Sequence, residues 1–226
     1  QGQTSRAQKG QIDDFNTYHE NILEWIKIAN EYKIPTFVLG VGLGGLIILN
    51  LLEKTELPIE GILLFSPMLE LKRDYKGRKN KLISNVGKIS KDTRFKVGIT
   101  PQDLTRNDEI IEETANDGLM LKKVTYSWYN LINEKMKETM DHIRDIKPIS
   151  ALIMYGTKDK ILETQSINEM KDKLKSKEMY FKVWDGLYHE IHNEPERDLV
   201  MGYVLSFLNN SVNTMGFIVN EEEIED

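Results

Sequence analysis

The chain has 226 residues, of which 40% are apolar and 29% are charged, and it contains no cysteine. This composition is that of a globular protein with one full core, and the lack of cysteine excludes disulfides, thiolate metal sites and a cysteine nucleophile. A formal net charge of −6 disfavours nucleic acid as a partner, since phosphate binding needs a basic face. No apolar run approaches the roughly 20 residues that span a bilayer, and the polar start of the chain does not resemble a signal peptide, so we expect a cytoplasmic protein.

The first predicted elements are a helix, a strand and a second helix. Apolar residues recur at helical spacing behind Asp13 and Asp14, which can cap a helix. These apolar residues are Phe15, Tyr18, Ile22, Trp25, Ile26 and Ala29. A short apolar strand at 36–39 then runs through a glycine-rich turn at 40–45 into an apolar helix at 46–52.

A second buried strand is predicted at 62–65, where it ends at Ser66-Pro67. The order strand, helix, strand implies parallel pairing with a right-handed crossover. From 68 to 146 the strand signals disappear and helical stretches such as 119–131 dominate. We therefore predict an inserted helical lid that lies over the sheet.

Strand character returns in the last third of the chain. Strands are predicted at 151–155 and 180–184, with a helix at 164–174 between them. The last helix is predicted to begin near Pro195, which suits a first helical turn, and to bury Leu199, Val204, Leu205 and Leu208. We expect one α/β domain, composed of core residues 1–67, a lid at 68–146, core residues 147–212 and a frayed acidic tail at 213–226.

The glycine-rich turn satisfies two patterns. As G-x-G-x-x-G it fits a dinucleotide fingerprint, in which glycines let a pyrophosphate approach a helix N-terminus. It also fits the frame of a nucleophile elbow, G-x-S-x-G, with Gly42 at the nucleophile position. A dinucleotide site needs an acid at the end of the second strand, but no carboxylate follows that strand before Glu70. The dinucleotide alternative is therefore the weaker one.

The elbow pattern requires an acid after a later strand and then a histidine after the next strand. Asp159 follows the strand at 151–155, and His189 follows the strand at 180–184. Alone, each would be interpreted as a loop or capping residue, but together they would meet the elbow at the C-terminal edge of a parallel sheet. Glu190 and His192 do not complete a metal site without further histidine or cysteine, so we predict no metal and no cofactor.

At these loops the chain resembles α/β-hydrolases of the monoacylglycerol lipase and lysophospholipase group, which is serine aminopeptidase S33-like. The group carries G-H-S-M-G-G where this chain has Gly40-Val41-Gly42-Leu43-Gly44-Gly45. Further similar segments are 156–159, 186–190, the lid residues 103–107 with 116–117, and Gly2-Gln3-Thr4-Ser5. The similarity covers essentially the whole chain and is closest to bacterial lysophospholipase-like members. It implies an α/β-hydrolase fold with an inserted helical lid and a mechanism of ester hydrolysis by serine, histidine and acid.

Two departures from the group bear on activity. Gly42 stands where the group has its nucleophilic serine, so an acyl-enzyme cannot form there. The group's oxyanion loop and first strands precede anything present here, so we expect those strands to be absent and Leu43 N–H to be the remaining oxyanion donor. Two functional hypotheses follow: an ester hydrolase that lacks its serine, with His189 acting on water directly, and a pseudo-enzyme that binds a lipid or a protein partner without turnover.

The expected ligand is a small acyl ester or a lipid. Met120, Trp128 and Tyr129 of the lid are candidates to line an acyl-chain pocket, with ordinary core packing as the alternative. Ser66 is expected to be structural, and His19 and His142 are expected at the surface. The strand at 36–39 would have an unpaired edge, which predicts self-association through that edge.

Overall fold

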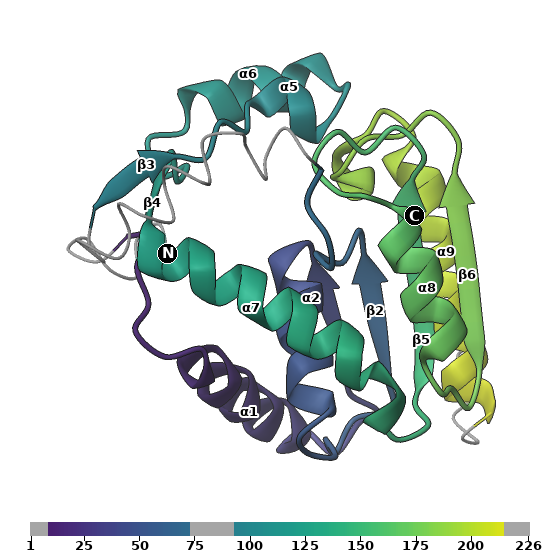
Figure 1. Cartoon of the computed structure of the whole chain (residues 1–226). Helices are drawn as coiled ribbons and strands as arrows, with labels where there is room; N and C mark the ends of the chain where they lie inside the picture. Colours follow the sequence, from purple (N-terminus) through teal and green to yellow (C-terminus); the bar gives the residue numbers. More distant parts are fainter. Residues whose placement is uncertain (1–8, 73–92, 215–226) are drawn as a thin grey trace.

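The computed structural model describes residues 9–72 and 93–214, which form a parallel sheet flanked by helices (Figure 1). The sheet has the strand order β1-β2-β5-β6, and every neighbouring pair is parallel. Its strands are β1 (Phe37–Val41), β2 (Gly61–Phe65), β5 (Ser150–Gly156) and β6 (Met179–Trp184). The α/β-hydrolase fold predicted from the sequence is confirmed, with each core strand within two residues of its expected position.

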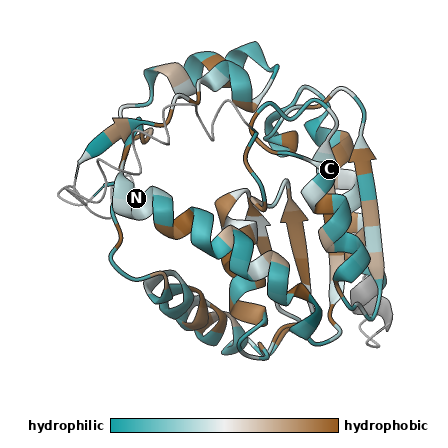
Figure 2. Ribbon diagram, viewed as in Figure 1, coloured by the Kyte–Doolittle hydropathy of each residue, from teal (hydrophilic) through white to brown (hydrophobic). Residues whose placement is uncertain are grey.

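Helices cover both faces of the sheet because the central strands are buried on both sides. Alternate residues of β2 pack into different halves of the core: Ile62 and Leu64 face one cluster, and Leu63 and Phe65 face the other. Figure 2 shows the resulting hydrophobic character along the whole of β2. Such strands contain continuous apolar runs rather than alternation.

One face carries α1 (Asn16–Asn30), α2 (Leu43–Leu52), α7 (Tyr126–His142) and α8 (Gln165–Lys173). The other face carries α9 (Arg197–Thr214), which lies behind β5 and β6 in Figure 1. The α2 helix runs directly from β1 and packs against α7, so the elbow is joined to the lid helix through the core.

The lid region differs from the prediction in containing strands. The three-residue strands β3 (Arg94–Lys96) and β4 (Lys123–Thr125) pair antiparallel, and α5 (Pro101–Leu104) and α6 (Asp108–Asn116) lie between them in the chain. Strands this short and this rich in basic residues give no periodic signal. The helix predicted over 119–131 begins only at Tyr126, because the Thr125 hydroxyl caps it by accepting a hydrogen bond from Trp128 N–H at 3.2 Å.

Several predicted side-chain positions are wrong. On α9 both Leu199 and Leu205 are more than half exposed, because the buried stripe of that helix is Val200, Val204 and Phe207. His19 is buried rather than at the surface, since it packs edge-on against Phe15 at a ring distance of 5.2 Å. His142 is exposed as predicted.

Some predicted features lie outside the described residues, namely the segment Gly2–Ser5, lid residues 73–92 and the acidic tail from residue 215 onward. Within the described part, β1 is an edge strand of the sheet. None of the described helices combines the length and the apolar character that crossing a membrane requires.

Candidate active site

The turn between β1 and α2 has the conformation of a nucleophile elbow, centred on Gly42. Its φ of 51° and ψ of −114° lie in a region that favours glycine. Its N–H donates to Phe65 O at 3.0 Å, so the turn is joined to the end of the neighbouring strand β2. A Cβ at Gly45 would come within 2.8 Å of Pro67 Cβ, so the start of α2 packs too closely on the β2 terminus for any side chain there.

The turn after β5 holds the carboxylate of Asp159, which is fully buried. Its Oδ1 accepts hydrogen bonds from Ile161 N–H at 2.8 Å and from Leu162 N–H at 2.9 Å. Its Oδ2 lies 2.8 Å from Nδ1 of His189. Two backbone donors therefore fix the orientation of the carboxylate and leave its second oxygen for the imidazole.

The loop after β6 places His189 between this carboxylate and the elbow. With Nδ1 donating to Asp159, the neutral imidazole has its acceptor lone pair on Nε2. A Cβ added at Gly42 would stand 3.1 Å from this Nε2, and among the described residues, apart from Gly42 and its two chain neighbours, only the ring of His189 comes within 4 Å of that point. The elbow lies more than 100 residues before both the acid and the histidine in sequence, and the three thus meet at one edge of the sheet.

The acid loop and the histidine loop are packed directly on each other. Lys158 N–H donates to Leu187 O at 3.0 Å. A Cβ at Gly156 would come within 2.2 Å of the same Leu187 O, so only glycine fits between the loops at that position. The short separation of Asp159 and His189 depends on this contact.

Leu43 is the first residue of α2 and follows the elbow directly. Its N–H has no acceptor one turn earlier in the helix, as at every helix N-terminus. The helix dipole adds positive potential at this end. The position suits the stabilisation of an oxyanion that forms beside Gly42.

An apolar cavity of about 620 Å³ lies within the lid, a size typical of small-ligand sites. Met120 and Trp128 line it, whereas Tyr129 does not and instead packs edge-on against Phe95. The remaining lining residues are Lys96, Val97, Gly98, Ile99, Thr100, Pro101, Gln102, Leu104, Ala115, Leu121, Lys122 and Val124. None of Gly42, Asp159 and His189 lines this cavity.

The α5 wall of the cavity is nevertheless bonded to both loops of the site. Leu104 O accepts from Glu190 N–H at 2.8 Å, next to the histidine. Lys160 Nζ, next to the acid, donates to Gln102 O at 2.8 Å. Two hydrogen bonds therefore connect this wall of the cavity to the loops of Asp159 and His189.

An ion pair between a buried glutamate and a partly exposed arginine, which the sequence did not reveal, joins the lid to the histidine loop. The side chain of Glu194 is fully buried and accepts from Arg106 Nε at 2.5 Å and from Arg106 N–H at 2.9 Å. Beside it, Thr105 Oγ1 donates to Asn193 O at 2.9 Å. Arg106 lies in the family-like segment 103–107, but nothing in the sequence pairs it with a glutamate 88 positions later.

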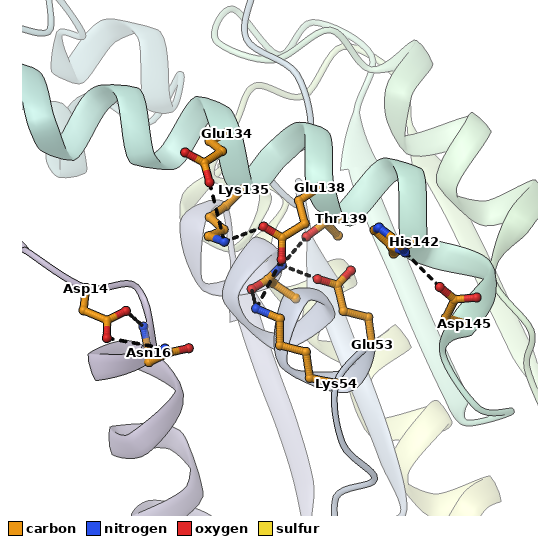
Figure 3. A network of polar contacts seen from close by, with 11 residues as sticks. Asp14, Asn16, Glu53, Lys54, Glu134, Lys135, Glu138, Thr139, His142 and Asp145 are labelled. Atoms are coloured by element: carbon orange, nitrogen blue, oxygen red, sulfur yellow. Dashed lines mark hydrogen bonds and ion pairs between the residues drawn. The ribbon is translucent and has the colours of Figure 1, made fainter.

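A second polar network lies at the far end of α2, away from the elbow, where α2 meets α7 (Figure 3). Asn50 Nδ2 donates to Thr139 Oγ1 at 3.0 Å, and Lys54 pairs with Glu138 at 3.2 Å. Burial and the nearby charge of Glu138 raise the pKa of Glu53 to about 7. Burial alone would raise the pKa of Glu138, but hydrogen bonds from Lys135 and Lys54 outweigh it and lower that pKa to about 2.

Metal binding finds no support in the described residues, which contain no cluster of three or more histidine, aspartate or glutamate side chains. His192 lies close to His189 in sequence, and burial lowers its pKa from the ordinary value. Its ring packs at 6.0 Å from that of Phe65 in a tilted arrangement. His192 therefore contributes to packing beside the site.

Comparison with known proteins places this geometry in a family. The family model described as serine aminopeptidase, S33, matches residues 1–196. Phospholipase YtpA of Bacillus subtilis is 30% identical over 208 residues, which are 92% of this chain and 80% of the relative. Monoacylglycerol lipase of Mycolicibacterium smegmatis is 37% identical over 57 residues, 25% of this chain and 20% of the relative.

Solved structures agree on the fold. The monoacylglycerol lipase of Paleococcus ferrophilus matches with a TM-score of 0.73 at 22% identity, covering 85% of this chain and 75% of that one. A soluble variant of monoglyceride lipase from Saccharomyces cerevisiae, in complex with a substrate analog, matches with a TM-score of 0.78 at 18% identity. The match covers 89% of this chain and 71% of that one.

Proposed function

Because the chain belongs to the serine aminopeptidase S33 family of α/β-hydrolases, we propose that it binds a monoacyl lipid ester between the elbow and the lid without forming an acyl-enzyme. The observation that carries this proposal is that Nε2 of His189 lies 3.1 Å from the Cβ position at Gly42, a residue with no side chain to supply a nucleophile. Relatives named phospholipase and monoacylglycerol lipase support a lipid ester as the ligand.

The chemistry of a serine hydrolase divides into parts that this chain keeps and a part that it lacks. A serine attacks the ester carbonyl, a histidine takes its proton, an acid orients the histidine, and N–H groups hold the oxyanion. His189, Asp159 and Leu43 N–H have positions suited to the last three roles. Loss of the nucleophile in a comparable triad costs on the order of 10⁶ in kcat, or roughly 8 kcal/mol.

The acyl chain has a suitable site in the lid cavity. Met120 and Trp128 supply apolar surface there, and the α5 wall is bonded to the loops of Asp159 and His189. An ester carbonyl near Leu43 N–H could accept its hydrogen bond while the acyl chain extends toward this wall and into the apolar cavity. Tyr129 would act indirectly, through its contact with Phe95 in β3.

The binding proposal is tested by calorimetric titration with a medium-chain monoacylglycerol and a lysophosphatidylcholine below their micelle concentrations. We expect saturable binding by the unaltered chain and at least ~10-fold weaker binding by Met120→Glu, because a carboxylate in an apolar cavity is strongly disfavoured. Met201→Glu, at a 40% exposed position of α9, is the matched control and should bind normally. Absence of saturable binding, or equal binding by Met120→Glu, would overturn the proposal.

A second candidate function is slow hydrolysis in which His189 activates a water directly. The retained bond between His189 and Asp159 favours it, since a histidine oriented in this way can act as a general base. Incubation with a p-nitrophenyl ester separates the two candidates. Turnover lost in His189→Ala would support hydrolysis, and equal release by both proteins would exclude it.

We also propose self-association through the outer edge of β1, because no strand of the described residues pairs with that edge and apolar residues surround it. Leu39 on β1 is 48% exposed, Ile34 before it is 63% exposed, and Trp25 on α1 is 70% exposed. Sedimentation velocity should show a concentration-dependent dimer that Leu39→Lys weakens. A monomer at all concentrations would contradict this proposal.

A further inference from the structure

The segment Phe65–Met68 leaves the end of β2 and lies between the elbow and the histidine loop. Phe65 O accepts from Gly42 N–H at 3.0 Å, and Met68 N–H donates to Gly42 O at 2.9 Å. Between these two bonds, Ser66 Oγ donates to the backbone carbonyl of His189 at 2.9 Å. One short segment therefore bonds both the elbow residue and the histidine.

The backbone of Ser66 does not explain why a serine stands there. Its φ is 43°, and Ser66 and Lys33 are the two non-glycine residues with positive φ in the described part of the chain. Lys33 is an exposed turn residue, whereas Ser66 is completely buried. A non-glycine residue in this region is strained by about 1–3 kcal/mol, so the backbone conformation alone would favour glycine. The hydroxyl is the feature that glycine would not supply.

The Ser66 hydroxyl donates its hydrogen bond to His189, the residue whose position relative to Gly42 defines the site. His189 is held by Asp159 through its ring and by Ser66 through its carbonyl. Ser66 is itself fixed, because its N–H continues the sheet by donating to Met154 O at 2.8 Å. The carbonyl of His189 is thereby anchored to the rigid centre of the sheet.

We propose that Ser66 is a positioning residue that holds His189 over Gly42 through its hydroxyl. This inference deepens the proposed function and rests on it for any enzymatic consequence, but the position of the imidazole is a property of the chain itself. A merely structural serine would satisfy a buried carbonyl without affecting the ring of His189.

Two variants separate the hydroxyl from the backbone strain. Ser66→Ala removes the hydroxyl and keeps the strain, whereas Ser66→Gly removes both. Ser166→Ala is the matched control: Ser166 is also buried, and its Oγ donates to the carbonyl of Glu163 at 2.7 Å, away from the site. If Ser66→Ala does not fold, the relaxed Ser66→Gly variant carries the test.

The first measurement records the NMR signals of the histidine rings in the otherwise unaltered chain at a fixed pH. The chain has four histidines, and exposed His142 serves as the internal reference. We expect both Ser66 variants to shift the ring signals of His189, and Ser166→Ala to leave them unchanged. Unchanged His189 signals in both Ser66 variants would overturn the proposal.

The second measurement introduces each change into a Gly42→Ser background and records kcat and KM for a p-nitrophenyl ester. We expect kcat to fall about 10- to 100-fold with KM unchanged, since a displacement of the order of 1 Å can cost 10²-fold in rate. An unchanged kcat in both Ser66 variants would contradict the positioning role. If the Gly42→Ser background itself shows no turnover, the proposal that an ester binds at the elbow fails. The NMR result alone then decides the role of Ser66.

Discussion

The ion pair between Arg106 and Glu194 permits a prediction whose size follows from burial. The Glu194 carboxylate is fully buried, and Arg106 supplies the guanidinium that balances its charge. Arg106→Ala would leave that carboxylate with one neutral backbone donor. Breaking a buried pair from one side typically costs about 3–5 kcal/mol, because the remaining charge is desolvated without a partner.

A loss of about 3–5 kcal/mol corresponds to a fall in melting temperature of roughly 6–20 °C for a chain of this size. Thermal and urea unfolding of Arg106→Ala measure it. Adding Glu194→Gln to that variant should recover part of the loss, since the double variant has no unpaired charge. The recovery distinguishes a charge effect from lost packing of the arginine.

Two control variants measure the change in unfolding free energy when no buried charge loses its partner. Arg144→Ala removes an exposed arginine, and Glu196→Gln removes the solvent-facing partner of Arg106, whose side chain is 38% exposed. Each should change the unfolding free energy by no more than about 1 kcal/mol. If Arg106→Ala also changed it by less than about 1 kcal/mol, the reasoning about a buried, balanced carboxylate at Glu194 would be refuted.

Two further predictions concern pH and packing. The pKa of Glu53 is raised to about 7, above its ordinary 4.5, so its contribution to stability is present below pH ~4.5 and is lost as the pH rises through 7. The effect of Glu53→Gln on the free energy of unfolding should therefore be more stabilising at pH 8 than at pH 5, by about 1–2 kcal/mol. This is less than the full pKa shift implies, because the side chain is half-buried. An effect that does not change with pH in urea unfolding would contradict this prediction. Gly156→Ala should destabilise by at least about 1–3 kcal/mol, since its Cβ would overlap Leu187 O, and a normal melting temperature would show that the loops separate freely.

The core of the fold could be predicted from the sequence because its signals are local. Each central strand is a continuous apolar run, and β2 is buried at all five positions. The glycines around Gly42 mark the abrupt passage from strand to helix. Asp159 and His189 follow strand ends, so the topology of a parallel sheet brings them to one edge without any long-range information.

The lid and several burial patterns could not be predicted because they depend on tertiary contacts. The strands β3 and β4 have three residues each and exist through their mutual pairing. His19 stands next to a charged residue in sequence, yet it packs against Phe15 and interacts with Asn50 of α2. The partnership of Arg106 with Glu194 arises only when the lid folds back onto the histidine loop.

Reaction of the Gly42→Ser variant with a fluorophosphonate, followed by intact-mass spectrometry, tests the central claim most directly. The claim is that the imidazole of His189, oriented by Asp159, faces the elbow, with its Nε2 3.1 Å from the Cβ position at Gly42. We predict stoichiometric labelling of Gly42→Ser, none of the unaltered chain, and loss of labelling in the double variant Gly42→Ser/His189→Ala. A folded Gly42→Ser variant that stays unlabelled, or labelling that persists without His189, would contradict the account.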